Sequence, residues 1–442
     1  MQTALILIFI EIIVILINLH LFKGDIFSPA TISSLGFLVS TLLALYCSNV
    51  WNFVISESTV LVISLGLLSM TLGEAVSRKI RIRIKKGTTS YMNNGSIYGI
   101  KTIYLNQSVR IALVVIIVLC TILYGLESYR VGLLNGGSTL NAFAYMKSAY
   151  FNEGLDKMNF FIRQGFKVVM AGAYISAFMF ANNFLVLKES FLKNLPYIIC
   201  MVCGFAITIF SASRTEMLRI ALAVLLDFAL LWKMNHERTR KQNKKSTRVV
   251  LKKMAPIFLM VLVIAFAARA VVKTSGGVSN ATSIVYYLAY YIGSPIAVLN
   301  TKISMAFSNS TLFLGSSKAV PEFVYLGRLS YGGNVATICW ASLYDKGLLY
   351  MMFRIFVLYL IGGYCYKIIS NYSINSARNN IKIILFSFIY YIYAMSYYSD
   401  IFSPKNIPSN LFTICVLVLA YEVLTDIMVN QCRKVTELKE KY

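Results

Sequence analysis

Apolar stretches, each close to the length of a membrane-spanning helix, recur along the whole chain and alternate with shorter polar segments. A bilayer core is crossed by about 20 predominantly apolar residues in helical conformation. About eleven windows meet this description, at residues 3–21, 31–48, 58–76, 109–125, 166–187, 196–212, 215–232, 254–272, 347–369, 381–398 and 409–428. The pattern predicts an all-α polytopic membrane protein, a single integral membrane domain over residues 1–442 with about 11 (10–12) transmembrane helices.

One further apolar stretch, residues 284–299, differs from the others because it is rich in tyrosine and contains Gly293 and Pro295. These two residues interrupt a regular helix, so we interpret the stretch as a helix that lies on the outer interface or enters the membrane part way. The alternative is an additional span. A single extra span would reverse the orientation of everything after it and place the C-terminal charges outside.

Basic loops fix the expected orientation. Residues 77–107 carry Lys and Arg with no acidic residue, and residues 233–253 carry nine basic residues against one acid. Both loops are therefore expected in the cytoplasm. An odd number of spans then places the N-terminus outside and the C-terminus in the cytoplasm. This topology leaves two long outer loops, at residues 126–165 and 273–346.

Composition supports a membrane protein and narrows the partners. The chain is 58% hydrophobic with a mean hydropathy of +0.68, values that no soluble domain of this size reaches. The net charge of +24 is concentrated in loops between spans. This distribution follows the positive-inside rule, so we expect membrane lipids as neighbours and no nucleic acid.

Cofactor motifs are absent from the sequence. It has no phosphate-binding glycine loop of the nucleotide-binding kinds and no zinc or EF-hand spacing. Cys200 and Cys203 form a CxxC pair, but they lie in an expected span without a partner pair, so we interpret them as small buried residues. The sequence therefore predicts no cofactor and no metal site.

The segment Ile209–Ile220 carries the strongest candidate chemistry. Ser213 followed by Glu216 is a capping box, which predicts the start of a helix. Arg214 lies in the first turn, and Arg219 lies deeper, where the membrane is apolar. A helix start with two guanidinium groups suits a phosphate or pyrophosphate. The alternative is that Arg214 reaches to lipid headgroups and Ser213 only caps the helix.

Further polar groups are expected at the same outer side of the membrane. These residues are Arg269, Lys273, Arg328, Tyr331, Asn334, Asp345 and Arg354. Arg354 lies about two turns inside its span, a costly position unless it faces a polar cavity. Several cations at this depth suit a lipid-linked pyrophosphate, whose phosphates lie at headgroup level.

Glycosyl transfer from a lipid pyrophosphate would use such a set. Fixed guanidinium groups could stabilise the leaving pyrophosphate without a metal, and the attacking hydroxyl needs a proton acceptor. Asp345 is the first candidate for this base and Glu216 the second, although Asp345 could instead cap a helix and Glu216 could serve the capping box. Tyr331 and Asn334 could bind sugar hydroxyls or be ordinary turn residues.

At these residues the sequence resembles a known family. The segments that carry the resemblance are Ser213-Arg-Thr at the mouth of a span, Asn334-Val-Ala-Thr, Leu343-Tyr-Asp-Lys-Gly347, and a span with Gly362-Gly363 and Tyr366. Together with a long outer loop late in the chain they are similar to the Wzy-type O-antigen polymerases, which polymerise oligosaccharide repeat units. The resemblance covers roughly residues 200 to 370, plus the general topology.

The resemblance implies a GT-C-like helical fold and a metal-independent enzyme of the bacterial inner membrane. It implies that undecaprenyl-pyrophosphate-linked repeat units are joined on the periplasmic face, with a chain-length regulator as a partner. The outer-face arginines of the family correspond to Arg214, and less directly to Arg269 and Arg328. The related ligases are expected to use a histidine in the long outer loop, and residues 273–346 contain none.

A flippase or exporter of lipid-linked oligosaccharides is the alternative function. In that case the arginines would line a translocation path, and charge would be spread over the full membrane depth. Here the charges cluster at the expected outer end of the spans, and the longest loop is expected outside. Both features favour an enzyme that meets its substrate on that side.

Overall fold

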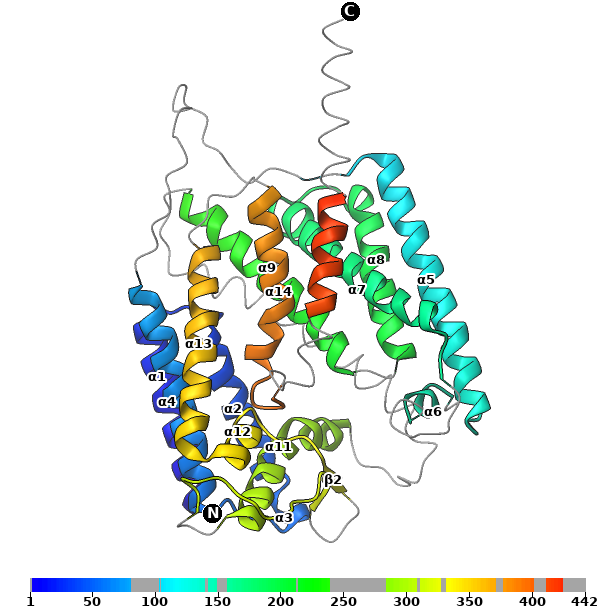
Figure 1. The fold of residues 1–442 in the computed structure, drawn as a ribbon. Coiled ribbons are helices and arrows are strands. Elements are labelled where there is room, and N and C mark those ends of the chain that lie inside the picture. Colours follow the sequence, from blue (N-terminus) through cyan, green and yellow to red (C-terminus); the bar gives the residue numbers. More distant parts are fainter. Residues whose placement is uncertain are drawn as a thin grey trace, which may run out of the picture. The chain divides into compact units, whose positions relative to one another are not determined.

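The computed structural model describes residues 2–80, 103, 105–139, 142–148, 157–211, 214–238, 284–307, 311–326, 331–370, 377–400 and 411–423. Helices dominate these residues (Figure 1). The chain divides into two compact units. Unit 1 comprises residues 1–94, 281–371 and 392–407, and unit 2 comprises residues 95–280, 372–391 and 408–442. Each unit is described by itself, so the expected single integral membrane domain stays a prediction.

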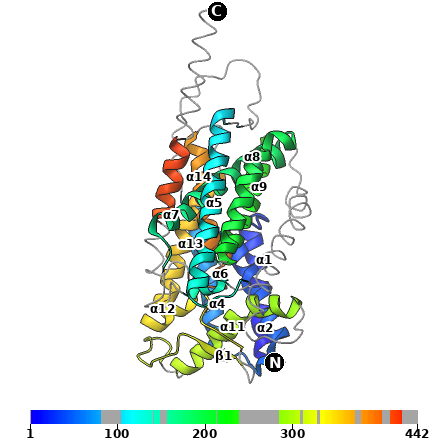
Figure 2. The same cartoon turned by 90° about the vertical axis from the view of Figure 1, so that its right-hand side faces the viewer.

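Unit 1 contains helices from both ends of the sequence. Its elements are α1 (Gln2–Leu21), α2 (Pro29–Tyr46), α3 (Ser48–Trp51), α4 (Glu57–Lys79), α11 (Ile284–Ala306), β1 (Val324–Leu326), β2 (Tyr331–Gly333), α12 (Cys339–Lys346) and α13 (Leu348–Ser370). The two short strands pair antiparallel and pack on α11 (Figure 2). The Tyr290 hydroxyl of α11 donates to the carbonyl of Gly332 in β2.

Local sequence explains the start of the helices that open unit 1. Pro29 occupies the first turn of α2, where its missing N–H is not needed. The Ser56 side chain accepts a hydrogen bond from the Thr59 nitrogen at 3.3 Å and caps α4. The last turn of α4 contains Arg78 and Lys79, whose positive charges interact favourably with the negative end of the helix dipole.

Glycine allows α4 and α13 to pack closely. A Cβ atom built at Gly73 would overlap the carbonyl oxygen of Phe356 and lie 3.0 Å from the Leu360 nitrogen. Contact with backbone atoms of a neighbouring helix cannot be relieved by a rotamer change. Helices in membranes rely on such small residues because apolar burial does not drive their association.

We therefore expect Gly73→Ala to destabilise the protein by about 1–3 kcal/mol, the usual cost of overpacking. Gly165→Ala in unit 2 is the matched control, because its Cβ would meet only Cys120 at 3.7 Å. The control is expected to gain up to about 1 kcal/mol from better helix propensity. Denaturant unfolding of the purified variants in detergent measures both effects, and equal signs would contradict the prediction.

Unit 2 also consists mainly of helices. Its elements are α5 (Gln107–Leu134), α6 (Ala142–Ser148), α7 (Phe160–Phe180), the π-helix η1 (Ala181–Val186), α8 (Phe191–Phe210), α9 (Arg214–Arg238) and an apolar helix, Leu411–Val423. Most of α14 (Ala377–Ala394) also belongs to unit 2. A Cβ at Gly204 of α8 would lie 2.6 Å from the Ala173 Cβ of α7, so these helices also pack closely.

Seven helices of the described residues are long and apolar enough to cross a membrane. They cover the first six expected spans and the ninth, with residues 160–186 forming one continuous segment. The chain is thus a helical, multi-pass membrane protein. Helix α9 covers the expected span 215–232, and α14 ends at Ala394, earlier than the expected span 381–398. The expected span 254–272 lies outside the described residues.

Two expected loop boundaries differ from the structure. Helix α4 includes Arg78 and Lys79, so the basic loop expected at residues 77–107 begins after the last turn of the helix. Helix α5 continues to Leu134, which makes the start of the expected loop 126–165 helical for about two further turns. An apolar window in the sequence ends at the first charged residues, whereas the helix continues past them for as long as the backbone keeps its helical conformation.

Helix α11 is the largest difference in the second expected outer loop. It runs from Ile284 to Ala306 as one helix, although Gly293 and Pro295 were expected to break the stretch. Gly293 is used for packing, because a Cβ there would lie 2.6 Å from the Ala44 nitrogen of α2. The Ser40 hydroxyl of α2 donates to the Ile292 carbonyl at 2.6 Å. Tertiary contact with α2, at Ile292 and Gly293, therefore supports the helix where the break was expected.

Candidate functional site

Helix α9 begins at Arg214, in agreement with the start that the sequence predicted. Ser213 and the side chain of Arg214 lie outside the described residues, so the capping hydrogen bond itself stays a prediction. Glu216 lies in the first turn of α9. Its spacing of three residues from Arg219 places both side chains on one helix face.

Arg219 is held on several sides within unit 2. The residue is 5% exposed. Its Nη1 atom lies 3.2 and 3.4 Å from the two carboxylate oxygens of Glu216, and its Nε donates to the Phe388 carbonyl at 3.3 Å. The guanidinium carbon lies 3.8 Å from the Phe388 ring centroid and 5.2 Å from that of Tyr391. The guanidinium is thus fixed by a carboxylate, a carbonyl and two aromatic faces.

The partners of Arg219 change the interpretation of Glu216. Both carboxylate oxygens of Glu216 face Arg219, and the carboxylate side chain is 25% exposed. The carboxylate therefore orients and neutralises Arg219, which favours a positioning role over that of the second candidate base. The aromatic and carbonyl partners come from α14, more than a hundred residues away in the chain.

Arg354, a candidate substrate-binding residue, is also paired with a carboxylate. Its two terminal nitrogens donate to the two carboxylate oxygens of Asp400 at 2.6 and 2.9 Å. The side chains of Arg354 and Asp400 are 18% and 9% exposed. A two-pronged pair of this kind satisfies an arginine in an apolar helix without any ligand. Both residues belong to unit 1.

Removing one partner of this pair is expected to destabilise the protein. Arg354→Leu leaves the Asp400 carboxylate buried and unpaired, at a cost of about 2 kcal/mol or more. Lys193→Leu is the control, because Lys193 and Glu189 form an ion pair at 4.0 Å in which the two side chains are 64% and 32% exposed, so that the remaining carboxylate stays in contact with water. The control should cost less than about 1 kcal/mol. Denaturant unfolding in detergent compares the two, and similar losses would contradict the expectation.

Asp345 lies in the last turn of α12 and is exposed. The alternative that it caps the following helix is wrong. Gly347, with a φ of 83°, separates α12 from α13, and its carbonyl accepts from the Met351 nitrogen at 3.1 Å. Among the described residues Asp345 has no ion-pair partner. Its carboxylate remains a candidate proton acceptor.

The two candidate sugar-binding residues lie at the hairpin of unit 1. Tyr331 is in β2 and pairs with Leu326 of β1, so it belongs to a strand rather than to a simple turn. Its side chain is not described. Asn334 follows the strand and is exposed. Arg269, Lys273 and Arg328 lie outside the described residues.

The predicted site residues thus fall into both units. Arg214, Glu216 and Arg219 belong to unit 2, whereas Tyr331, Asn334, Asp345 and Arg354 belong to unit 1. Each group is brought together by its own unit. The convergence of the two groups in one site stays a prediction.

A buried lysine near the hairpin gave no signal in the sequence. Lys302 of α11 is 4% exposed, and its Nζ lies 5.4 Å from the Trp340 ring centroid. Burial lowers the pKa of the Lys302 ammonium, while the charge of Glu322 acts in the opposite direction. The ammonium therefore adds a positive charge beside Trp340, between α11 and α12.

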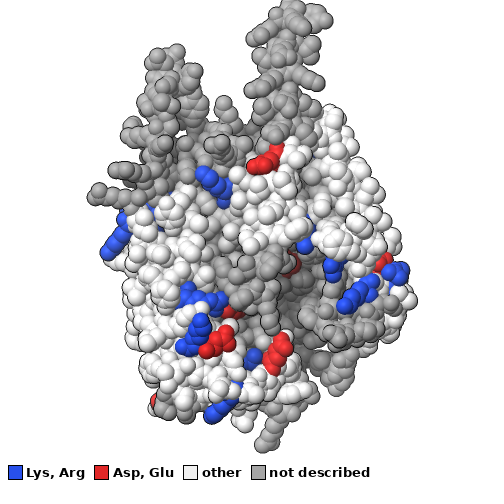
Figure 3. Space-filling model, in the orientation of Figure 1, with Lys and Arg blue, Asp and Glu red and all other residues white. Residues whose placement is uncertain are grey.

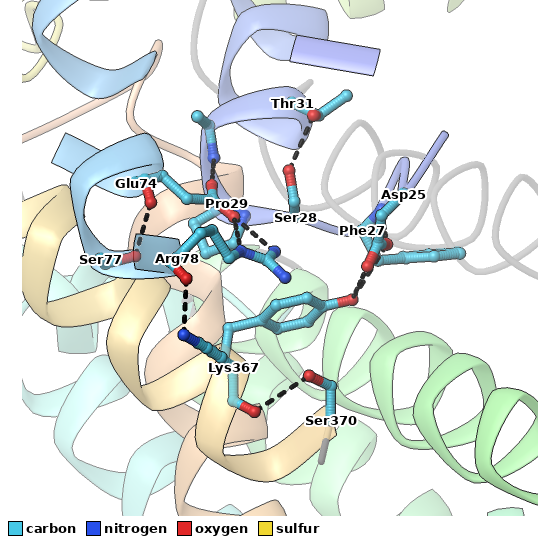
Figure 4. Close-up of polar contacts among 12 residues, drawn as sticks. Asp25, Phe27, Ser28, Pro29, Thr31, Glu74, Ser77, Arg78, Lys367 and Ser370 are labelled. Atoms are coloured by element: carbon cyan, nitrogen blue, oxygen red, sulfur yellow. Dashed lines mark hydrogen bonds and ion pairs between the residues drawn. The ribbon is translucent and has the colours of Figure 1, made fainter. Parts of the chain in front are cut away.

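Unit 1 contains a second polar cluster that sequence reasoning missed (Figure 4). Glu74 of α4 is fully buried, and its Oε2 accepts from the Ala30 nitrogen in the first turn of α2 at 2.7 Å. Its Oε1 accepts from Arg78 Nη2 at 2.7 Å and from Arg78 Nε at 3.2 Å. The carboxylate thus occupies the anion position at the N-terminus of α2.

Aromatic rings and a second carboxylate complete this cluster. The Arg78 guanidinium carbon lies 5.4 Å from the Phe22 ring centroid and 5.1 Å from that of Tyr366. The Tyr366 hydroxyl lies 3.0 Å from both carboxylate oxygens of Asp25. Lys367 donates to the carbonyl of Arg78 at the end of α4 (Figure 4) and to that of Ile80. These contacts place the last turns of α4 and α13 at the same end of unit 1.

No group of three or more His, Cys, Asp or Glu side chains in the described part of the chain is arranged to hold a metal ion. Most of the described surface on the face that Figure 3 shows is uncharged. Protein-family models, curated proteins and solved structures gave no significant match to the chain.

Proposed function

We propose that this protein is a metal-independent glycosyltransferase that polymerises undecaprenyl-pyrophosphate-linked oligosaccharide repeat units. The product is O-antigen or a related surface polysaccharide. The proposed location is the bacterial inner membrane, with the N-terminus in the periplasm, the C-terminus in the cytoplasm and the reaction on the periplasmic face. A chain-length regulator is the proposed protein partner.

The fixed guanidinium of Arg219 is the observation that supports this proposal most. An arginine inside an apolar helix is costly and is retained where it serves a function. Here it is 5% exposed and lies five residues from Arg214, the first residue of the same helix. Its partners hold it in one orientation before any substrate arrives. Pre-oriented charges stabilise a developing anion without the cost of reorganisation.

The reaction needs positive groups that stabilise the charge of the leaving pyrophosphate, and it needs a proton acceptor. A hydroxyl oxygen of one repeat unit forms a bond to the anomeric carbon of the growing glycan. The bond from that carbon to the pyrophosphate oxygen breaks, and the pyrophosphate leaves with the electron pair beside Arg214 and Arg219. The hydroxyl proton passes to a carboxylate, and Asp345 is the candidate because it is exposed and has no ion-pair partner among the described residues.

A flippase remains the second candidate, and one experiment separates the two. The lipopolysaccharide of a strain that lacks this protein is compared by gel electrophoresis with that of the complemented strain. We expect core plus a single repeat unit in the absence of the protein and a ladder of lengths after complementation. Complete loss of glycan from the core, with not even one unit attached, would favour flipping and contradict the proposal.

A further inference from the structure

Asp227 is a buried acidic residue that none of the proposed roles uses. It lies in the apolar segment Ala223–Leu231 of α9 and is fully buried. The Ser387 hydroxyl of α14 donates to one carboxyl oxygen of Asp227. The other oxygen, Oδ2, has no hydrogen-bond partner among the described residues. A carboxyl group in this position is costly, so its presence calls for a function.

The partner of Asp227 is next in sequence to the main partner of Arg219. Ser387 precedes Phe388, whose carbonyl accepts from Arg219 and whose ring lies 3.8 Å from the guanidinium carbon. Asp227 and Arg219 are eight residues apart, about two turns, and therefore share one face of α9. The hydrogen bonds of Asp227 with Ser387 and of Arg219 with Phe388 thus both join one face of α9 to one face of α14.

An aromatic residue of α7 supports the same region. The Tyr174 ring lies 5.2 Å from the Phe388 ring in an edge-to-face arrangement. Tyr174 also interacts electrostatically with Arg219, Glu216 and Asp227. The position of Phe388 is therefore set from two sides, by the ring of Tyr174 and by the hydrogen bond of the preceding Ser387.

We propose that Asp227 is a positioning residue for Arg219. By binding Ser387 it fixes the position of α14 along α9, so that Phe388 holds the guanidinium in the orientation that receives the leaving pyrophosphate. This inference rests on the proposed glycosyl transfer for its role in the reaction. The positioning itself is a property of the protein without substrate and is measured without it.

Asp227→Asn is the conservative variant, and it is informative because of the hydrogen bonds that are possible between residue 227 and Ser387. The Ser387 hydroxyl has one proton and lies near two acceptors, the Asp227 carboxyl and the Ile383 carbonyl at 2.9 Å. An asparagine at position 227 offers both an acceptor and N–H donors at the same place. Asp227→Asn should therefore keep the contact, whereas Asp227→Leu removes it.

The first measurement is the reactivity of Arg219 in the purified full-length protein in detergent. Phenylglyoxal modifies accessible arginines, and mass spectrometry of the peptide that contains Arg219 gives the rate. We expect Asp227→Leu to raise this rate about tenfold, the factor that corresponds to the loss of one hydrogen bond to a charged group. Asp227→Asn should react at the wild-type rate.

Glu11→Leu is the matched control. Glu11 is also a fully buried carboxyl that accepts from one hydroxyl, that of Thr41 at 2.8 Å, and its Oε2 has no partner among the described residues. It belongs to unit 1, whereas Asp227 and Arg219 belong to unit 2. The control should leave the reactivity of Arg219 unchanged. If Asp227→Leu does not fold, Ser387→Ala replaces it, because that variant removes only the hydroxyl.

The second measurement is the glycan ladder in the strain that lacks the protein. We expect Asp227→Leu to lose the ladder and Asp227→Asn to restore it. Unchanged reactivity of Arg219 in Asp227→Leu or Ser387→Ala would overturn the inference, as would raised reactivity with a normal ladder. Failure of the wild-type protein to restore a ladder contradicts the proposed function instead, and the reactivity measurement still decides the positioning.

Discussion

Arg214→Ala is expected to abolish polymerisation while the protein still inserts and folds. Arg214 is the first residue of α9, and in the proposed function the free N–H groups of the helix and the guanidinium would bind the same pyrophosphate. Removing one group that stabilises charge in a transition state lowers the rate about 100- to 1000-fold. The gel should therefore show core plus one repeat unit, as in the strain without the protein.

Arg163→Ala provides the control for this prediction. Arg163 also lies near the start of a helix in unit 2, but its side chain is exposed, and its guanidinium carbon lies 5.5 Å from the Phe160 ring centroid of its own helix. Its loss should leave the ladder unchanged. Membrane fractions with equal amounts of both variants establish that insertion is intact. A ladder of normal length in Arg214→Ala would remove Arg214 from the site.

Arg78→Leu is expected to cause the largest loss of stability. Glu74 is fully buried, and Arg78 is the basic side chain bonded to its carboxylate among the described residues. Without Arg78 the carboxylate stays buried with only the Ala30 nitrogen as a described partner. Breaking a buried pair in this way costs about 3–5 kcal/mol. Denaturant unfolding in detergent should show this decrease in the free energy of unfolding.

Two further variants make this result specific to the pair. Lys79→Leu removes the adjacent charge of the same helix turn, which is exposed, and should change stability by about 0.5 kcal/mol or less. The double variant Glu74→Leu/Arg78→Leu removes both charges and should recover much of the loss, because no unpaired charge remains. A double variant less stable than Arg78→Leu would contradict the pairing argument.

Sequence reasoning succeeded where one stretch of chain contains the whole signal. The apolar windows located the long helices α1, α2, α4, α5, α7, α8 and α13, because about 20 apolar residues must pair their backbone groups internally in a membrane. The start of α9 was also readable, since Ser213, Arg214 and Glu216 lie within one turn. The pair of Glu216 and Arg219 was not predicted, although their spacing of three residues in the helix allows it.

It failed where the partner of a residue is distant in the chain. Sequence reasoning did not predict that Asp400 pairs with Arg354 across 46 residues. Gly293 and Pro295 were expected to interrupt a regular helix, but contact of α11 with α2 allows the helix to continue. Arg78 was expected among the charges of the basic loop at residues 77–107, and only the tertiary structure shows that it pairs with Glu74.

By itself the sequence determined that this is a helical membrane protein, where most of its helices lie, and that two arginines stand at the start of α9. Those properties depend on hydrophobicity, charge and local helix geometry. The tertiary structure decided which partners each charge has: Glu216 and Phe388 for Arg219, Asp400 for Arg354, and Arg78 for Glu74. A buried charge is stable only with its partner, and apart from local pairs such as Glu216 and Arg219, folding alone brings the partners together.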